Sequence, residues 1–197
     1  MKFKNLIFIA VIFSLCWTSP VKSSTLYNKI ETVALLNYAR YCMLANINNT
    51  TPPKAPEFAL KEQRPCFVTF FQGKRVFACF GSFSPRKSNL AEEIRENIRL
   101  ALLNDPRARN VSYEMAKTAG IQITFPEHLR AVQNYNEINP AREGMFIESD
   151  NSGVAFVPGE AKTASWAFRQ GLRRLGEKDP KAVRIYKFDA TAISTRQ

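Results

Sequence analysis

The chain has 197 residues, with 28 lysines and arginines against 17 aspartates and glutamates, so its formal net charge at neutral pH is +11. This length fits one domain with a substantial hydrophobic core, and four cysteines are too few for a disulfide scaffold. The positive charge favours anionic neighbours such as phosphate, membrane headgroups or nucleic acid. The sequence contains no glycine-rich phosphate loop and no dinucleotide-binding fingerprint.

The first 23 residues have the layout of a secretory signal peptide. Lys2 and Lys4 give a positive start, residues 6–17 form an uncharged apolar run, and Val21 and Ser23 supply the small residues of a cleavage site. The run has twelve residues, whereas a transmembrane helix needs about 20. We therefore expect cleavage after Ser23, export to the bacterial periplasm or cell envelope, and no transmembrane anchor after cleavage.

Removal of residues 1–23 leaves 174 residues and a net charge of +8. An exported bacterial protein rarely meets nucleic acid, so nucleic acid is not expected as a partner. Cys16 raises the alternative of a lipoprotein, but the bulky Leu15 before it fits a lipobox poorly.

The first half of the mature chain predicts a helix, a loop and a hairpin. Residues 26–44 are expected to form a helix with an inward face made of Tyr27, Ile30, Ala34, Tyr38 and Tyr41. Residues 46–57 are rich in Asn and Pro and predict a loop. The apolar runs 66–71 and 75–80 predict two strands joined at Gln72-Gly73, where glycine supplies a positive φ.

The second half alternates strands and helices. Asn89 and Glu92 predict a capping box for a helix over residues 90–104, which Pro106 ends. Further elements are expected as strands at 121–125, 145–148, 154–157 and 183–193, and as a basic amphipathic helix at 162–175. The predicted fold class is α+β, a single domain with a mainly antiparallel sheet flanked by helices.

Three cysteines, Cys42, Cys66 and Cys79, remain after processing, so outside the cytosol at least one is a free thiol or links two chains. A two-residue turn at Gln72-Gly73 would place Cys66 opposite Cys79, with Cα atoms about 4.5 Å apart, at the short end of disulfide geometry. A disulfide between them is therefore one prediction, and a longer turn that shifts the register is the alternative.

Several short motifs occur in an order typical of one family. They are Phe67-Val68-Thr69-Phe70, Ala78-Cys79-Phe80-Gly81-Ser82, Asp105-Pro106-Arg107, Val111-Ser112-Tyr113-Glu114, Ile121 to Pro126, Gly144-Met145, Phe156-Val157-Pro158 and Tyr186-Lys187-Phe188-Asp189-Ala190. In this order they resemble the AMMECR-type domain family, a component of the AmmeMemoRadiSam grouping, whose hallmark loop reads Gly-Cys-Ile-Gly-Thr. The resemblance covers nearly all of residues 24–197.

The resemblance implies a site around the hallmark loop, residues 78–82. Its implied ligand-binding residues are Gly81, Ser82, Asp105, Arg107, Glu114 and Pro158. This chain has Phe77 where the family has an arginine, which removes a charge next to the loop, and family members are mostly intracellular. The family's biochemical role is unsettled, so the resemblance names no reaction and implies no cofactor.

Cys79 is the candidate catalytic residue. It ends a strand just before Gly81-Ser82, where backbone N–H groups of a turn can lower a thiol pKa. The alternative is that Cys79 packs as a small hydrophobic residue. His128, the single histidine, is expected in a solvated loop, which argues against a Ser-His-Asp, Cys-His or zinc site.

Residues 162–187 carry a local charge of +6, from eight basic and two acidic side chains. This segment is either an anion-binding face, with Trp166 and Tyr186 available for stacking, or a solvated helix surface. The sequence thus favours a small-ligand-binding or accessory domain with a pocket beside residues 79–82, and it leaves a protein partner open. The alternatives are a thiol-dependent enzyme that uses Cys79 and a basic scaffold that binds phosphate-bearing partners. No metal site is predicted.

Overall fold

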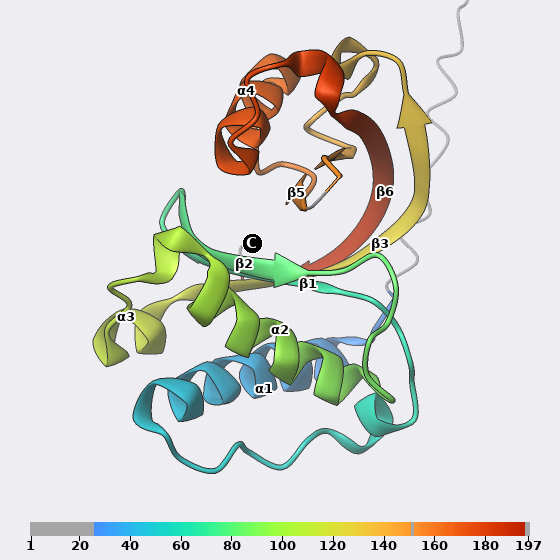
Figure 1. The fold of residues 1–197 in the computed structure, drawn as a ribbon. Coiled ribbons are helices and arrows are strands. Elements are labelled where there is room, and N and C mark those ends of the chain that lie inside the picture. Colours follow the sequence, from blue (N-terminus) through green and yellow to red (C-terminus); the bar gives the residue numbers. More distant parts are fainter. Residues whose placement is uncertain (1–25, 151, 196–197) are drawn as a thin grey trace, which may run out of the picture.

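The computed structural model describes residues 26–150 and 152–195, and the expected leader and its cleavage site lie outside the described residues. Six strands form one antiparallel sheet in the order β2-β1-β3-β6-β4-β5 (Figure 1). The strands are β1 (Phe67–Gln72), β2 (Arg75–Gly81), β3 (Gly120–Val132), β4 (Gly144–Glu148), β5 (Gly153–Phe156) and β6 (Arg184–Ser194). The helices are α1 (Lys29–Asn48), α2 (Leu90–Asn104), α3 (Tyr113–Thr118) and α4 (Ala164–Leu175). The predicted α+β class with an antiparallel sheet is confirmed.

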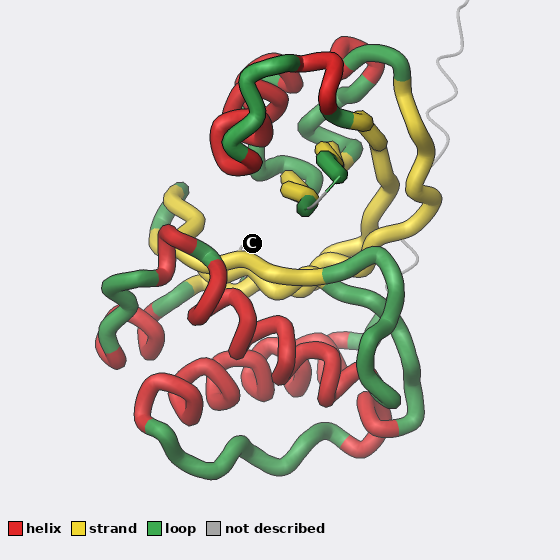
Figure 2. Tube along the Cα trace, viewed as in Figure 1, coloured by secondary structure: helices red, strands yellow, loops and turns green. Residues whose placement is uncertain are grey.

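The sheet curls so strongly that its two ends have separate hydrophobic cores. The helical lobe consists of β1, β2 and the adjoining part of β3, covered by α1, α2 and α3, and the small lobe consists of β4, β5 and α4. The long strands β3 and β6 run through both lobes and connect them, as the yellow tubes in Figure 2 show. A β-bulge between Glu127 and Arg130, with His128 at a φ of 51°, lies in β3. Because a bulge bends its strand, it accounts for part of this curl.

The bulge corrects the expectation for His128. The residue lies within β3, which extends well beyond the predicted 121–125, and its imidazole Nδ1 is 3.3 Å from the carboxylate of Asp189 on β6. His128 is solvent-exposed, as expected. Within residues 26–150 and 152–195, no group of three or more His, Cys, Asp or Glu side chains is arranged to hold a metal ion.

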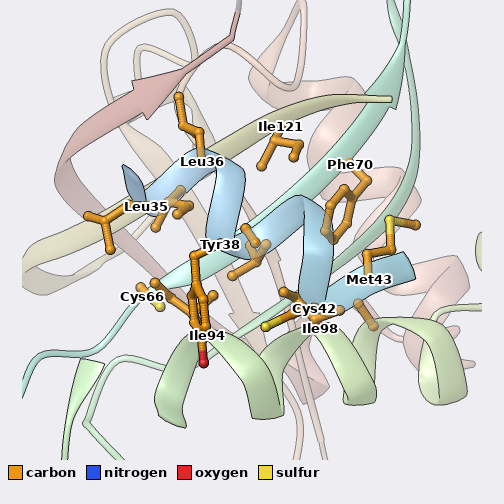
Figure 3. Packing of buried hydrophobic residues seen from close by; sticks show 14 of the residues in the cluster. Leu35, Leu36, Tyr38, Cys42, Met43, Cys66, Phe70, Ile94, Ile98 and Ile121 are labelled. Carbon is orange, nitrogen blue, oxygen red and sulfur yellow. The ribbon is translucent and has the colours of Figure 1, made fainter. Parts of the chain in front are cut away.

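Helix α1 covers Lys29–Asn48 rather than the predicted 26–44, and its buried face agrees only in part with the predicted one. Its N-terminus has a capping box, in which the Asn28 side chain accepts from the Glu31 backbone N–H and the Glu31 side chain accepts from the Asn28 N–H. The buried face includes Leu35, Leu36, Tyr38, Cys42 and Met43, which pack between α2 and the sheet (Figure 3). The predicted face is wrong at Ile30 and Tyr41, which are exposed.

Helix α2 has the bounds that the sequence predicted. Asn89 caps it by accepting a hydrogen bond of 2.9 Å from the backbone N–H of Glu92. Leu90, Ile94 and Ile98 are fully buried against α1 and the sheet, as the 3.6-residue period predicted. This helix therefore forms one wall of the helical lobe and places its C-terminus beside β2.

The register of the β1–β2 hairpin differs from the prediction, which removes the basis for a Cys66–Cys79 disulfide. The turn is Gly73-Lys74 rather than Gln72-Gly73, and a bulge beyond it shifts the pairing further. Cys79 consequently faces Thr69. Cys66 lies on the opposite face of the sheet, in the core of the helical lobe, because side chains alternate along a strand. Cys42, Cys66 and Cys79 are all free thiols.

Candidate functional site

A cleft of about 660 Å³ lies between the two lobes, on the sheet face opposite α1 and α2. The end of β2 and the loop that follows it form one wall, the segment after α2 forms a second, and the small lobe closes the cleft. Its lining residues are Phe67, Cys79 to Phe83, Asn104 to Arg107, Phe146, Ser152 to Ala155, Arg174 and Leu175. The volume is in the usual range for small-molecule sites.

Aromatic side chains make up much of the cleft wall and join the lobes. The Phe83 ring contacts Phe67, Phe146 and Phe188, with ring centroids 5.2, 4.8 and 5.0 Å apart. These are the separations of favourable edge-to-face and tilted pairs. Phe83 on the loop after β2 is therefore held by residues from β1, β4 and β6 at once, which fixes one wall of the cleft.

Gly81 is required by the close approach of β1. A Cβ at this position would lie 2.4 Å from Phe67 Cδ1 and 2.5 Å from both the Cys66 carbonyl oxygen and Phe67 Cα. Two of these three atoms belong to the backbone, so they cannot rotate away as the end of a flexible side chain can. The glycine of the hallmark loop thus allows β1 and β2 to approach closely at the edge of the cleft.

The loop after Gly81 is held by a buried carboxylate that the sequence analysis missed. Glu93 on α2 is 1% exposed and accepts hydrogen bonds from the backbone N–H groups of Arg86 and Lys87 at 2.8 and 3.0 Å. The Ser82 hydroxyl lies 3.1 Å from the same carboxylate. Asn97, one turn further along α2, is also buried and donates to the Cys66 carbonyl at 2.9 Å. Glu93 and Asn97 lie four residues apart, next to the apolar stripe of α2. This spacing is the sequence signal from which the network could have been predicted.

Asp105 organises the second wall of the cleft. Its carboxylate accepts a hydrogen bond of 2.9 Å from the Cys79 backbone N–H, and it receives Nε and Nη2 of Arg107 at 3.0 and 2.7 Å. Such a two-pronged contact between a guanidinium and a carboxylate is strong and directional. Asp105 therefore ties the end of α2 to the hallmark loop and orients Arg107.

Arg107 also reaches across the cleft to the small lobe. Its Nη1 lies 3.2 Å from Glu160, whose second oxygen accepts from the Val157 backbone N–H, also at 3.2 Å. The side chains of Asp105 and Glu160 are 7% and 6% exposed, so this group of three charges is largely withdrawn from water. Burial lowers the pKa of Arg107, but its hydrogen bond to Asp105 and the charges of Asp105 and Glu160 outweigh that effect and raise the pKa.

Cys79 has the wrong environment for a thiolate nucleophile. Burial raises the pKa of the Cys79 thiol to about 12, and the negative charge of Glu160 acts in the same direction. Its Sγ lies 3.2 Å from Thr69 Oγ1. The thiol is therefore protonated at neutral pH, and the site does not favour a thiol-dependent enzyme.

The structure brings most of the residues implied by the resemblance into one place. Cys79, Gly81, Ser82, Asp105 and Arg107 all line the cleft. Pro158 instead lines a smaller cavity of about 110 Å³, which it shares with Thr69 and Glu160. Glu114 is exposed on α3 and lines neither cavity.

Phe77 stands where the family has an arginine, but its side chain is not part of the cleft. It is 1% exposed and packs in the core of the helical lobe, with its ring centroid 6.3 Å from that of Phe70. Phe77 therefore does not affect the charged groups of the cleft, which are Asp105, Arg107 and Arg174.

The basic C-terminal segment contains two basic side chains that pair with carboxylates and one arginine that lines the cleft. Arg184 pairs with Glu148 at 3.2 Å, and Lys187 pairs with Glu143 at 3.0 Å. Arg174 on α4 lines the cleft and lies over the Phe156 ring, with 4.9 Å between its Cζ and the ring centroid. Sequence reasoning had counted this arginine only as one of eight surface charges.

Comparison with known proteins agrees with the ordered motifs. A family model described as AMMECR1 matches residues 36–192. This chain belongs to the AMMECR1 family. A protein of Thermotoga maritima is 28% identical over 112 residues, which are 56% of this AMMECR1 chain and 62%, less than two thirds, of the relative's length.

The AMMECR1 fold is also seen in a solved structure. An uncharacterised protein from Pyrococcus horikoshii has a TM-score of 0.64 and 17% sequence identity, over 80% of this chain and 88% of that one. At this identity the likeness shows the fold alone. In residues 26–150 and 152–195 we find no helix long and apolar enough to cross a membrane.

Proposed function

We propose that this AMMECR1-family protein binds a small molecule in the cleft between its lobes. The observation that carries the proposal is a cavity of about 660 Å³ whose walls are mainly aromatic and aliphatic, with Asp105, Arg107 and Arg174 as its charged groups. A largely apolar cavity with a few convergent polar side chains is the usual form of a small-ligand site. The protein then acts as a ligand-binding or accessory component rather than through its thiol.

Hydrogen bonds and an ion group hold the walls of the cleft in place. Glu93 holds the loop after β2, Asp105 holds the hallmark loop to α2, and Arg107 joins Asp105 to Glu160 of the other lobe. A cavity whose walls are fixed before the ligand arrives binds with less loss of conformational freedom. The basic-scaffold alternative has less support, because two of the eight basic side chains in residues 162–187, Arg184 and Lys187, are already paired with carboxylates.

The test is ligand capture by the purified mature protein and by a variant with a filled cleft. Ala155→Trp places an indole in the cleft, and Ala131→Trp, at an exposed position of β3 outside it, is the matched control. After incubation with a metabolite extract and gel filtration, mass spectrometry of the released molecules should find species that wild type and Ala131→Trp retain and Ala155→Trp does not. Equal retention by all three proteins, with native circular dichroism spectra, would contradict binding in this cleft.

Export is a second, separate part of the proposal. It is supported by the charged start, the apolar run of twelve residues and the small residues before Ser24. N-terminal sequencing of the protein from its native host should begin near Ser24 in an extracytoplasmic fraction. An intact Met1 in a cytosolic fraction would contradict it.

A further inference from the structure

The charges that line the cleft differ in whether they already have partners. Asp105 and Arg107 bind each other, and Arg107 also binds Glu160, so these three side chains are already engaged with one another. Arg174 has no carboxylate within ion-pair distance among residues 26–150 and 152–195. Of the charged groups in the cleft, Arg174 is the one that remains available to a ligand.

Arg174 is also held in a position suited to binding. Its guanidinium lies over the Phe156 ring, at a distance typical of cation–π contacts, while part of the side chain is exposed to solvent. Partial burial and the nearby positive charge of Arg107 lower the pKa of Arg174, and Glu160 and Asp105 offset this only in part. An anion beside this guanidinium would give Arg174 the direct ion-pair partner that it lacks among the described residues.

The rest of the cleft specifies the body of the ligand. Phe67, Phe80, Phe83 and Phe146 line it together with Val154 and Leu175. Aromatic walls accept planar rings by stacked or edge-to-face contacts. The positively charged Arg174 argues against a cationic ligand, which an aromatic cage could otherwise bind.

We infer that the cleft selects small aromatic anions, with the ring system against the wall that the phenylalanines form and a carboxylate, sulfonate or phosphate on the Arg174 guanidinium. This inference rests on the proposed function and adds the chemical class of the ligand. The planar guanidinium fork can donate two parallel hydrogen bonds to such a group. Arg107 contributes by position rather than by contact, because each of its three guanidinium nitrogens already donates to Asp105 or Glu160.

Two fluorescent probes with the same ring skeleton separate the charge from the apolar contact. Anilinonaphthalene sulfonate carries one negative charge, and N-phenylnaphthylamine is its uncharged parent. Both are titrated into the mature protein and into Arg174→Gln, Arg174→Lys and Arg173→Gln. Arg173→Gln is the matched control, because it removes the same charge from the next position of α4 at a residue that does not line the cleft.

The expected result is a large effect on one probe only. Arg174→Gln should weaken binding of the sulfonate at least tenfold and change binding of the neutral probe less than twofold. Arg174→Lys should give an intermediate loss, since it keeps the charge without the fork. Arg173→Gln should change neither affinity more than twofold, and added salt should weaken only the sulfonate.

The outcomes that overturn the inference differ from those that overturn the proposed function. If wild type binds the neutral probe as tightly as the sulfonate, or Arg174→Gln weakens both equally, the cleft binds ligands without selecting anions and the inference fails alone. If neither probe binds, or if Ala155→Trp retains both affinities, small-molecule binding in this cleft fails and takes the inference with it.

Discussion

The ion group formed by Asp105, Arg107 and Glu160 gives the sharpest stability prediction. The substitution Arg107→Met keeps most of the side-chain volume and removes the charge, which leaves two carboxylates, 7% and 6% exposed, without their partner. Breaking a buried pair in this way costs about 3–5 kcal/mol. Because the Arg107 side chain is itself 25% exposed, we expect the lower part of that range, about 3 kcal/mol.

The control is an arginine with comparable partners at the surface. Arg184 contacts Glu148 and Asp150 at 3.2 and 3.6 Å, but its side chain is 58% exposed. Solvent screening weakens such exposed pairs, so Arg184→Met should cost much less stability than Arg107→Met. The two variants therefore compare the same residue change at one buried and one exposed site.

Urea unfolding measures both variants. The reasoning also predicts a rescue: adding Asp105→Asn and Glu160→Gln to Arg107→Met should recover at least about 1 kcal/mol, since the cost comes from uncompensated carboxylates. If Arg107→Met costs no more than Arg184→Met, or if the triple variant is less stable than the single one, the lobes are not joined by this ion group.

Two further predictions concern the hallmark loop. Gly81→Ala should destabilise the protein by about 2–3 kcal/mol in a thermal melt, because the new Cβ meets the backbone of Phe67 and must push β1 away. Cys79→Ser should cost about 1 kcal/mol or less at pH 8, because the new hydroxyl can bond Thr69 Oγ1. The folded pKa of Cys79, about 12, lies above that of an unfolded thiol, so the stability that its neutral thiol contributes is complete below about pH 8 and declines as pH rises. By pH 10 wild type should have lost about 2 kcal/mol relative to Cys79→Ser, so the gap between the two proteins should close or reverse.

The sequence predicted those elements whose signals are local. Helix α2 has its predicted bounds, because Asn89 is an effective cap and the apolar period is clear from Leu90 to Ile98. The sequence predicted helix α1 but not the face that it buries, because apolar residues also occur on its exposed side, at Ile30, Val33 and Tyr41. A periodicity argument cannot choose between two apolar faces of one helix.

The strand register was not predictable from the same kind of signal. Gly73 can form a two-residue turn either with Gln72 before it or with Lys74 after it. The choice between the two turns depends on how the strands pair further along. The bulge between Phe70 and Phe71 adds another shift that no residue type announces. Because of these two features, Cys66 does not face Cys79. The hairpin was therefore predicted correctly, but the disulfide prediction was wrong.

The site was predictable only in the part that lies close together in the sequence. The hallmark loop and Asp105 were found through the family resemblance. By contrast, Glu160 reaches Arg107, and Arg174 reaches the cleft, only because β3 and β6 fold the small lobe back over β2. This folding of the small lobe over β2 also gives the charged side chains different roles. Asp105 and Glu160 are both engaged by Arg107 in holding the walls, so the protein's structural needs leave Arg174 as the charge in the cleft with which a ligand can pair. A sum of basic residues over the C-terminal segment could not have made this distinction, because it depends on which carboxylates the fold brings within reach of each arginine.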